Sequence, residues 1–227
     1  MTKQDLGTHK VYYNSKGEKI PSVTTLLNFV NSHLDGWANY MGLKGVNTKT
    51  HVKERANYGT YIHSICEKFF RGEDLSTLEP DYTYINQYYL EDLLFKLSTI
   101  KEIFQRKGYE FYDAELSLSG EYYGGTIDLI LYNPTDNDYV VLDFKTSKST
   151  YLKQYVQLAG YSLLLKEVKD INVKAVCIIL IEKPVQDSTF INLRLREHNL
   201  HNEQIFTYLS NIYYTCTPEE RKFYYAS

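Results

Sequence analysis

The sequence is poor in cysteine, and the three cysteines that it has are widely separated. Cys66, Cys177 and Cys216 form no CxxC pair and are odd in number, which argues against a disulfide framework and a cysteine-rich metal site. Cys66 and Cys177 lie within apolar stretches, so we expect both to be buried thiols.

Long apolar runs are also missing. The longest, residues 173–181, is interrupted by Lys174 and falls well short of the roughly 20 residues that a membrane helix needs. The first ten residues are polar and contain no apolar segment of the kind found in signal peptides. We therefore expect no membrane association and no secretion, but a place in the cytoplasm or in a compartment continuous with it.

Basic residues are not in excess, because the formal net charge of the 227 residues is −3. This balance argues against a nucleic-acid binder that depends on bulk positive charge, but it suits an enzyme whose carboxylates hold divalent cations. Tyrosine is unusually frequent, with 23 residues, and we interpret this as amphipathic core packing rather than base stacking.

The spacing of apolar residues predicts a mixed sheet flanked by helices. Helices are expected at 23–30, 52–70, 84–107, 150–168 and 202–214, and strands at 110–118, 122–131, 139–145, 173–181 and 189–195. A short hairpin with Gly17 in its turn is expected near the start, and a second hairpin turn at 119–121. Residues 31–50 are expected to be irregular or broken helix. The element order describes an α/β fold.

Two acidic residues interrupt apolar runs that are expected to be neighbouring strands. Asp128 lies in Thr-Ile-Asp-Leu-Ile and Asp143 in Val-Val-Leu-Asp-Phe. A carboxylate in mid-strand is costly unless it is paired or binds a metal. Lys145 follows Asp143 at a spacing of two, which places both side chains on the same face of a strand. We expect a metal site with an attendant base whose pKa the metal lowers.

Two predicted helices carry polar residues that fit such a site. His63 and Glu67 follow Gly59 at successive spacings of four, beside the apolar seam of the first of these helices. Gln157 and Tyr161 share a face of the second. Each residue alone has an ordinary explanation, such as a hydrogen-bonded histidine or a surface glutamine. As a set, the carboxylates favour Mg²⁺ or Mn²⁺, and a histidine ligand favours Mn²⁺.

Together these motifs resemble those of the PD-(D/E)xK nuclease superfamily, in its RecB-like exonuclease branch. The matching pieces are Gly59-x-x-x-His63-x-x-x-Glu67, Gly125-x-x-Asp128, Asp143-x-Lys145 and Gln157-x-x-x-Tyr161. They occur in the family's order between residues 58 and 161, and Pro21-Ser22-Val23-Thr24 resembles mitochondrial genome-maintenance and phage exonucleases. The resemblance implies a single domain, with a restriction-endonuclease-like core at about residues 52–182 and additions at 1–51 and 183–227.

The resemblance also implies roles for these residues. His63, Asp128, Asp143 and the backbone carbonyl of Phe144 would bind one or two Mg²⁺ or Mn²⁺ ions, while Lys145 would position or deprotonate the attacking water. Gln157 and Tyr161 would orient Lys145 and contact the scissile strand. Glu67 and Glu115 are weaker candidates for an outer-shell or second-metal role, and an exposed hairpin residue is the preferred interpretation of Glu115. Three scattered cysteines cannot hold the four-cysteine iron–sulfur cluster of some relatives, so none is expected.

These roles imply a metal-dependent DNA exonuclease that acts from free ends and leaves 5′-phosphates, with single strands as one candidate substrate. Candidate phosphate contacts, for which ordinary solvated surface is an equal alternative, are Lys44, Lys49, Lys53, Arg55, Lys148 and Lys153. An endonuclease of the same fold and a non-catalytic module that binds nucleic acid or protein are the rival interpretations. Polarity, strand preference, processivity, oligomeric state and pathway (replication, recombination or repair) stay open.

Overall fold

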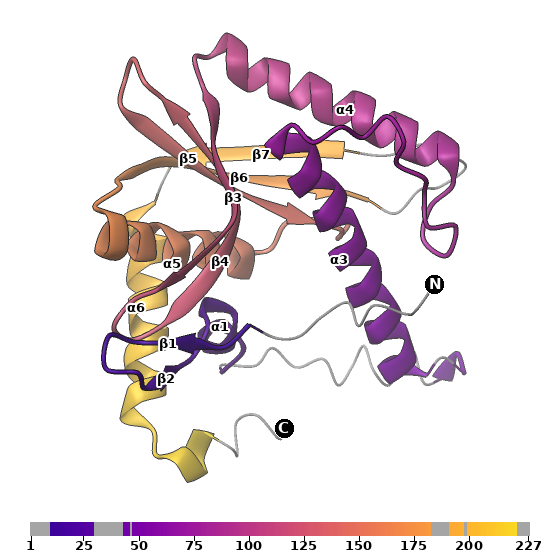
Figure 1. The fold of residues 1–227 in the computed structure, drawn as a ribbon. Coiled ribbons are helices and arrows are strands. Elements are labelled where there is room, and N and C mark those ends of the chain that lie inside the picture. The colour runs from indigo at the N-terminus through magenta and orange to yellow at the C-terminus, as the bar shows by residue number, and fades with distance from the viewer. Residues whose placement is uncertain (1–9, 30–42, 46, 183–190, 198, 222–227) are drawn as a thin grey trace.

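A five-stranded mixed sheet forms the centre of the computed structural model, which describes residues 10–29, 43–45, 47–182, 191–197 and 199–221 (Figure 1). The strands lie in sequence order: β3 (Glu110–Ser119), β4 (Gly124–Asn133), β5 (Asp138–Lys145), β6 (Val173–Ile181) and β7 (Ile191–Glu197). β5 and β6 run parallel and are joined by the crossover helix α5 (Leu152–Lys169), whereas the other neighbouring strands are antiparallel. The expected α/β class is confirmed.

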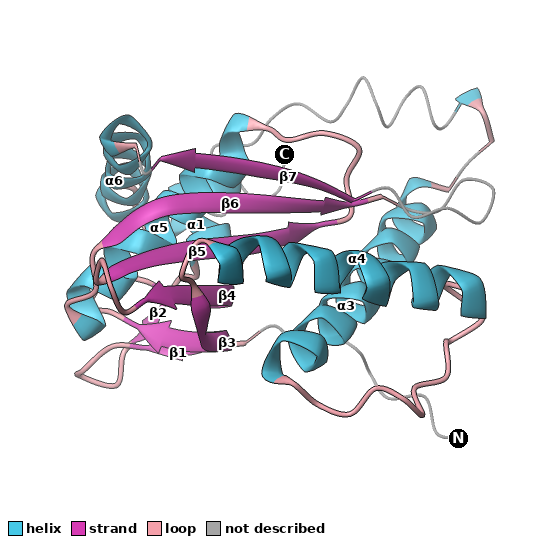
Figure 2. Cartoon of the chain, turned by 90° about the horizontal axis from the view of Figure 1, so that it is seen from above, coloured by secondary structure: helices cyan, strands magenta, loops and turns pink. Residues whose placement is uncertain are grey.

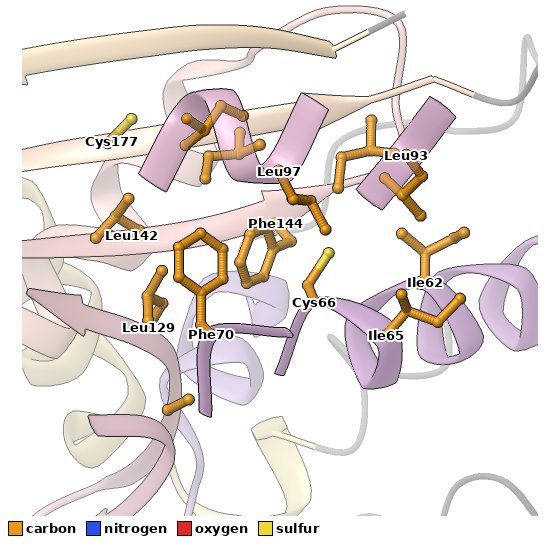
Figure 3. Packing of buried hydrophobic residues seen from close by; sticks show 14 of the residues in the cluster. Ile62, Ile65, Cys66, Phe70, Leu93, Leu97, Leu129, Leu142, Phe144 and Cys177 are labelled. Atoms are coloured by element: carbon orange, nitrogen blue, oxygen red, sulfur yellow. The ribbon is translucent and has the colours of Figure 1, made fainter. Parts of the chain in front are cut away.

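Helices cover both faces of the sheet. α3 (Thr48–Arg71) and α4 (Gln87–Arg106) pack on one face, and α5 and α6 (Leu200–Thr215) pack on the other (Figures 1 and 2). The α3/α4 face is filled by a cluster that includes Ile62, Leu97 and Phe144 (Figure 3). Cys66 and Cys177 are fully buried in this cluster, as expected. No helix in the described part of the chain is long and apolar enough to cross a membrane.

The N-terminal addition is a hairpin followed by a short helix. β1 (Tyr12–Tyr13) pairs with β2 (Lys19–Ile20), and Gly17 adopts a φ of 75° in the turn between them. α1 (Val23–Phe29) begins after Ser22, whose hydroxyl accepts a hydrogen bond from the backbone N–H of Thr25 at 3.0 Å. α1 contacts β4, α5 and α6, so the addition lies on the α5/α6 side of the sheet.

Four helices begin at residues other than those expected: α3, α4, α5 and α6, of which all but α5 have an asparagine N-cap whose side chain accepts a backbone N–H. α3 starts at Thr48, within the segment expected to be irregular, and the Asn47 side chain accepts the N–H of Thr50. Residues 30–42 and 46 of that segment lie outside the described part, as do residues 189–190 of the last expected strand. α4 starts at Gln87 rather than at position 84, because Asn86 caps it.

The hairpin between β3 and β4 has a longer loop than expected. Instead of a turn at 119–121, β3 continues through Ser119 and residues 120–123 form the connection. The N–H of Gly120 donates to the carbonyl of Tyr123 and closes this loop. The change shifts the register of the two strands, which decides which side chains face each other near the site.

Candidate metal centre and active site

The site lies where β4 and β5 separate. Their pairing ends at Leu129 opposite Leu142, and beyond that point the N–H of Phe144 donates to Asp128 Oδ2 at 2.8 Å instead of to the β4 backbone. The free edge of β4 is taken by the segment before α1, since the N–H of Gly124 donates to the Pro21 carbonyl and Ser22 bridges to Gly124. Asp128 therefore stands at a fork between two strands.

Glu115 lies opposite Asp128 across the β3–β4 pair. Ala114 pairs with Leu129 and Leu116 with Ile127, which places Glu115 and Asp128 at the intervening positions. Ala114 and Leu129 belong to the α3/α4 cluster, whereas Leu116 and Ile127 pack on the α5 side. Both strands thus change faces here, and Glu115 has a φ of 49°, in the left-handed region. The Glu115 and Asp128 carboxylates lie where the two strands change faces.

The side chains of Asp113 and Arg71 bind the backbone of Ala114, next to the point where β3 changes faces. The N–H of Ala114 donates to Asp113 Oδ1 at 2.8 Å, and its carbonyl accepts a hydrogen bond from Arg71 Nη2. Arg71 also donates through Nε to Glu67 Oε1 at 3.0 Å. Glu67 is therefore paired within α3 to the arginine that contacts β3, and it is not part of the ligand cluster described next.

Three possible metal ligands converge at the fork. His63 from α3, Glu115 from β3 and Asp128 from β4 each offer a ligand atom, and these atoms all lie within 4.8 Å of one another. His63 Nδ1 is 3.4 Å from Asp128 Oδ2. Two ligands at about 2.1 Å from one ion are about 3.0 Å apart at right angles and about 4.2 Å apart in line. The cluster therefore fits one small divalent cation after a slight contraction.

Asp143 and Lys145 lie beside this cluster on the α5 side of β5. Their parallel partners on β6, Ile178 and Leu180, both belong to the α5-side core. Lys145 Nζ is 2.5 Å from Asp143 Oδ2, which agrees with the expected same-face placement. Asp143 Oδ2 is buried, and the Lys145 ammonium is its partner. A buried carboxylate of this kind needs a cation beside it, and here the Lys145 ammonium supplies that charge.

Burial and neighbouring charges shift the pKa values of Asp128 and Asp143 in opposite directions. Burial raises the pKa of Asp128, but His63, Lys145 and the Phe144 N–H more than offset this, and the net pKa is lowered. Burial dominates at Asp143 and raises its pKa, although Lys145 opposes the change. Burial lowers the pKa of Lys145, and the two aspartates outweigh it, so the net pKa is raised. Lys145 is thus an ammonium group held by carboxylates, and the lowered pKa expected for it beside a metal stays a prediction.

Gln157 and Tyr161 form a buried pair on α5. Gln157 Nε2 donates to Tyr161 Oη at 2.8 Å, and both side chains are almost fully buried. Among the described residues, neither makes a hydrogen bond to Lys145, so their role in orienting it stays a prediction. Tyr161 packs against Gly125, where an added Cβ would lie 2.7 Å from the ring. The glycine of the second motif therefore lets the tyrosine of the fourth motif reach the site.

The structure gives fewer contacts for the other motif residues and for the candidate phosphate contacts. An added Cβ at Gly59 would meet Thr146 Oγ1 at an ordinary 3.6 Å, so packing within the chain does not require glycine there. The Phe144 ring lies edge-on to His63, with centroids 5.8 Å apart, and the role of the Phe144 carbonyl as a ligand stays a prediction. Lys153 donates to Asn28 Oδ1 at 2.6 Å. The other candidate phosphate contacts are exposed and stay predictions: Lys44, Lys49, Lys53, Arg55 and Lys148.

The fold and the carboxylate–lysine site define a class of nucleases. A sequence profile of the PD-(D/E)XK nuclease superfamily matches residues 37–213, well over half of the chain. The protein belongs to this superfamily.

A solved structure shows the same architecture. The chain is similar to a candidate exonuclease from Eubacterium rectale, at 13% identity and a TM-score of 0.50, over 85% of this chain and 77% of that one. A phage-related exonuclease from Haemophilus somnus is 11% identical, with a TM-score of 0.38, over 90% of this chain and 93% of that one. The first similarity supports the fold alone, and the second carries no argument. No curated protein sequence matches the chain.

Proposed function

We propose that the protein is a divalent-metal-dependent DNA exonuclease that acts from free ends and leaves 5′-phosphates. The observation that carries this proposal is the cluster of His63, Glu115 and Asp128 next to the Asp143–Lys145 pair. Oxygen ligands with one histidine suit Mg²⁺ or Mn²⁺. When bound, such a cation polarises the phosphodiester and stabilises the charge that develops in the transition state.

The chain's own residues hold and orient the reacting groups. The Phe144 N–H fixes Asp128 Oδ2 at 2.8 Å, and Asp128 in turn lies 3.4 Å from His63, so these ligands are positioned before any substrate arrives. Asp143 holds the Lys145 ammonium at 2.5 Å. Lys145 is the group that positions the attacking water, and its charge stabilises the anionic transition state. Glu115 completes the ligand set, in place of the exposed hairpin role preferred for it from the sequence.

Digestion of end-labelled DNA by the purified full-length protein tests the proposal. We expect Mg²⁺- or Mn²⁺-dependent release of mononucleotides or short products, and loss of cleavage with EDTA and in Asp143→Asn. Asp138→Asn is the matched control, because Asp138 lies on the same strand but pairs with Lys174 outside the site. Asp138→Asn should cut at the wild-type rate. The proposal is wrong if wild type and Asp143→Asn are equally inactive across both metals on single- and double-stranded substrates.

Two rival functions make different predictions in the same assay. An endonuclease cuts closed circular DNA, whereas an exonuclease leaves it intact, and substrates blocked at the 5′ or 3′ end report polarity. A non-catalytic module cuts neither. Calorimetric titration with Mn²⁺ separates this last case from an inactive preparation, because metal binding that is lost in Asp128→Ala shows an intact metal centre.

A further inference from the structure

A groove leads away from the site across the N-terminal addition. It begins in a cavity of about 210 Å³ that is lined by Glu115 and Tyr161 of the site. A second cavity of about 490 Å³ continues it outward, between the β1–β2 hairpin, α1 and the C-terminal end of α6. The two cavities share the residues Lys10, Tyr12, Ser22 and Thr24 and so form one path. We call this path the basic groove.

The charge of the basic groove is opposite to that of the whole chain. Lys10, Lys19 and Arg221 line the outer cavity, and no aspartate or glutamate is among its described lining residues. The chain as a whole carries a formal net charge of −3. Of these three cations, Lys10 alone forms an ion pair with a described residue, at 3.6 Å from Glu115. Lys19 and Arg221 have no carboxylate partner among the described residues, so their charges can interact with an external anion.

Aromatic side chains accompany these cations. The Arg221 guanidinium lies 4.4 Å from the centre of the Tyr213 ring and 5.7 Å from that of Tyr214, and both tyrosines line the outer cavity. Tyr12 lies at the junction with the inner cavity. Cations that contact phosphates, interleaved with aromatic faces on which bases stack, are the chemistry that binds single-stranded nucleic acid without sequence preference.

The groove has a fixed wall at its inner end. The Tyr12 ring packs against Gly124, where an added Cβ would overlap it, and Tyr12 Oη is 2.8 Å from Thr126 Oγ1 on β4. The hairpin is therefore fastened to the same strand that carries Asp128. A strand lying in the groove would be held in register with the site by this connection.

We infer that the basic groove binds one DNA strand and feeds it to the metal centre, with Lys19 and Arg221 contacting its phosphates. This inference rests on the proposed nuclease function, and it assigns a substrate-binding role to the N-terminal hairpin and the end of α6. Single-stranded DNA is the occupant that the cations and aromatic faces favour. Duplex DNA is an outcome of the test.

Binding in EDTA tests the groove separately from cleavage. The probe is a fluorescein-labelled single-stranded oligo(dT), with anisotropy read over a range of monovalent salt, for wild type, Lys19→Gln, Arg221→Gln and the double variant. Losing two phosphate contacts should reduce the slope of log K against log salt by about 1.4, which at 0.1 M salt weakens binding about 25-fold. Lys169→Gln is the matched control, because Lys169 is an exposed lysine at the far end of α5.

Each result decides the inference. Weaker binding with the reduced slope in Lys19→Gln and Arg221→Gln, and wild-type binding in Lys169→Gln, supports the groove. Equal binding by all proteins, equal losses in the control, or a loss seen only with duplex DNA overturns it. Arg221 also donates to the Tyr213 carbonyl at 2.9 Å, so its variant is checked by thermal melting. Lys19 makes no such contact in the described part of the chain, so Lys19→Gln keeps the test valid if Arg221→Gln is less stable.

Failure of the groove and failure of the proposed function give different results. Asp143→Asn should lose cleavage and bind the oligonucleotide as wild type does in EDTA. If the protein cuts DNA but the groove variants bind as wild type does, the proposed function stands and the inference about the groove is wrong. If the groove variants bind more weakly but the protein never cuts DNA, the inference about the groove stands and the proposed function is wrong.

Discussion

Replacing Glu115 with glutamine should change stability in opposite directions with and without metal. Burial, and then the charge of Asp128, raise the pKa of Glu115. A raised carboxyl pKa means that the ionised form destabilises the fold above that pKa. The isosteric Glu115→Gln change removes this charge at pH 7.5 and keeps the shape and the left-handed backbone position. Without metal, the variant should therefore be more stable than wild type.

The magnitude follows from the spacing of the ligand atoms. Two unit charges at the upper limit of 4.8 Å repel by about 3 kcal/mol at an effective dielectric constant of about 20. Lys10, 3.6 Å from Glu115, and His63 offset much of this repulsion. A net gain of about 1 kcal/mol raises the melting temperature of a chain of this size by about 2–4 °C.

In the presence of metal, wild type should be more stable than Glu115→Gln. A cation present at about 100 times its dissociation constant stabilises wild type by about 2.7 kcal/mol, or about 5–10 °C in melting temperature. Glu115→Gln loses a charged ligand, so its metal-induced rise should be much smaller. Differential scanning fluorimetry in EDTA and in a Mn²⁺ series measures both effects, with Glu110→Gln as an exposed control on the same strand. A Glu115→Gln protein that gains as much from Mn²⁺ as wild type would refute the ligand role of Glu115.

Two further predictions concern packing. Gly124→Ala should lower the free energy of unfolding by about 1–3 kcal/mol in urea titrations, because its Cβ would overlap the Tyr12 ring. Gly59→Ala, in the middle of α3 with its nearest contact at 3.6 Å, should instead raise it by about 0.5–1 kcal/mol, and equal losses at both glycines would contradict this reasoning. In thiol labelling of the native protein, the half-buried Cys216 should react first and the two buried cysteines only on unfolding; three equally fast thiols would show that the core is not closed.

Much of the site could be predicted because its residues obey local periodicity. Asp143 and Lys145 share a face by the strand repeat of two, and His63 stands at the edge of the α3 seam by the helical repeat. The interruption of two apolar runs by Asp128 and Asp143 marks both as costly unless they serve a ligand. These inferences need no knowledge of which elements meet in space.

The importance of Glu115 could not be predicted in the same way, because it depends on register. A turn centred on Gly120 would put Tyr112 opposite Asp128, whereas the loop at 120–123 puts Glu115 there. The sequence also gives no sign that residue 115 adopts a φ of 49°, or that Arg71 of another element binds the neighbouring Ala114 carbonyl. Glu115, for which an exposed hairpin position was the preferred interpretation, is instead half-buried beside Asp128 in this register.

The departure from regular pairing at the end of β4 links the metal centre to the N-terminal addition. If β4 and β5 stayed paired past Leu129 and Leu142, the Phe144 N–H would remain in the ladder and would not fix Asp128. The free edge at Gly124 would then be covered by β5, and the Pro21–Ser22 segment could not dock there. The same fork that orients a ligand thus also positions the hairpin and α1 beside it. Residues 10–29 are therefore positioned by the same fork as Asp128, although they lie outside the region of the four motifs.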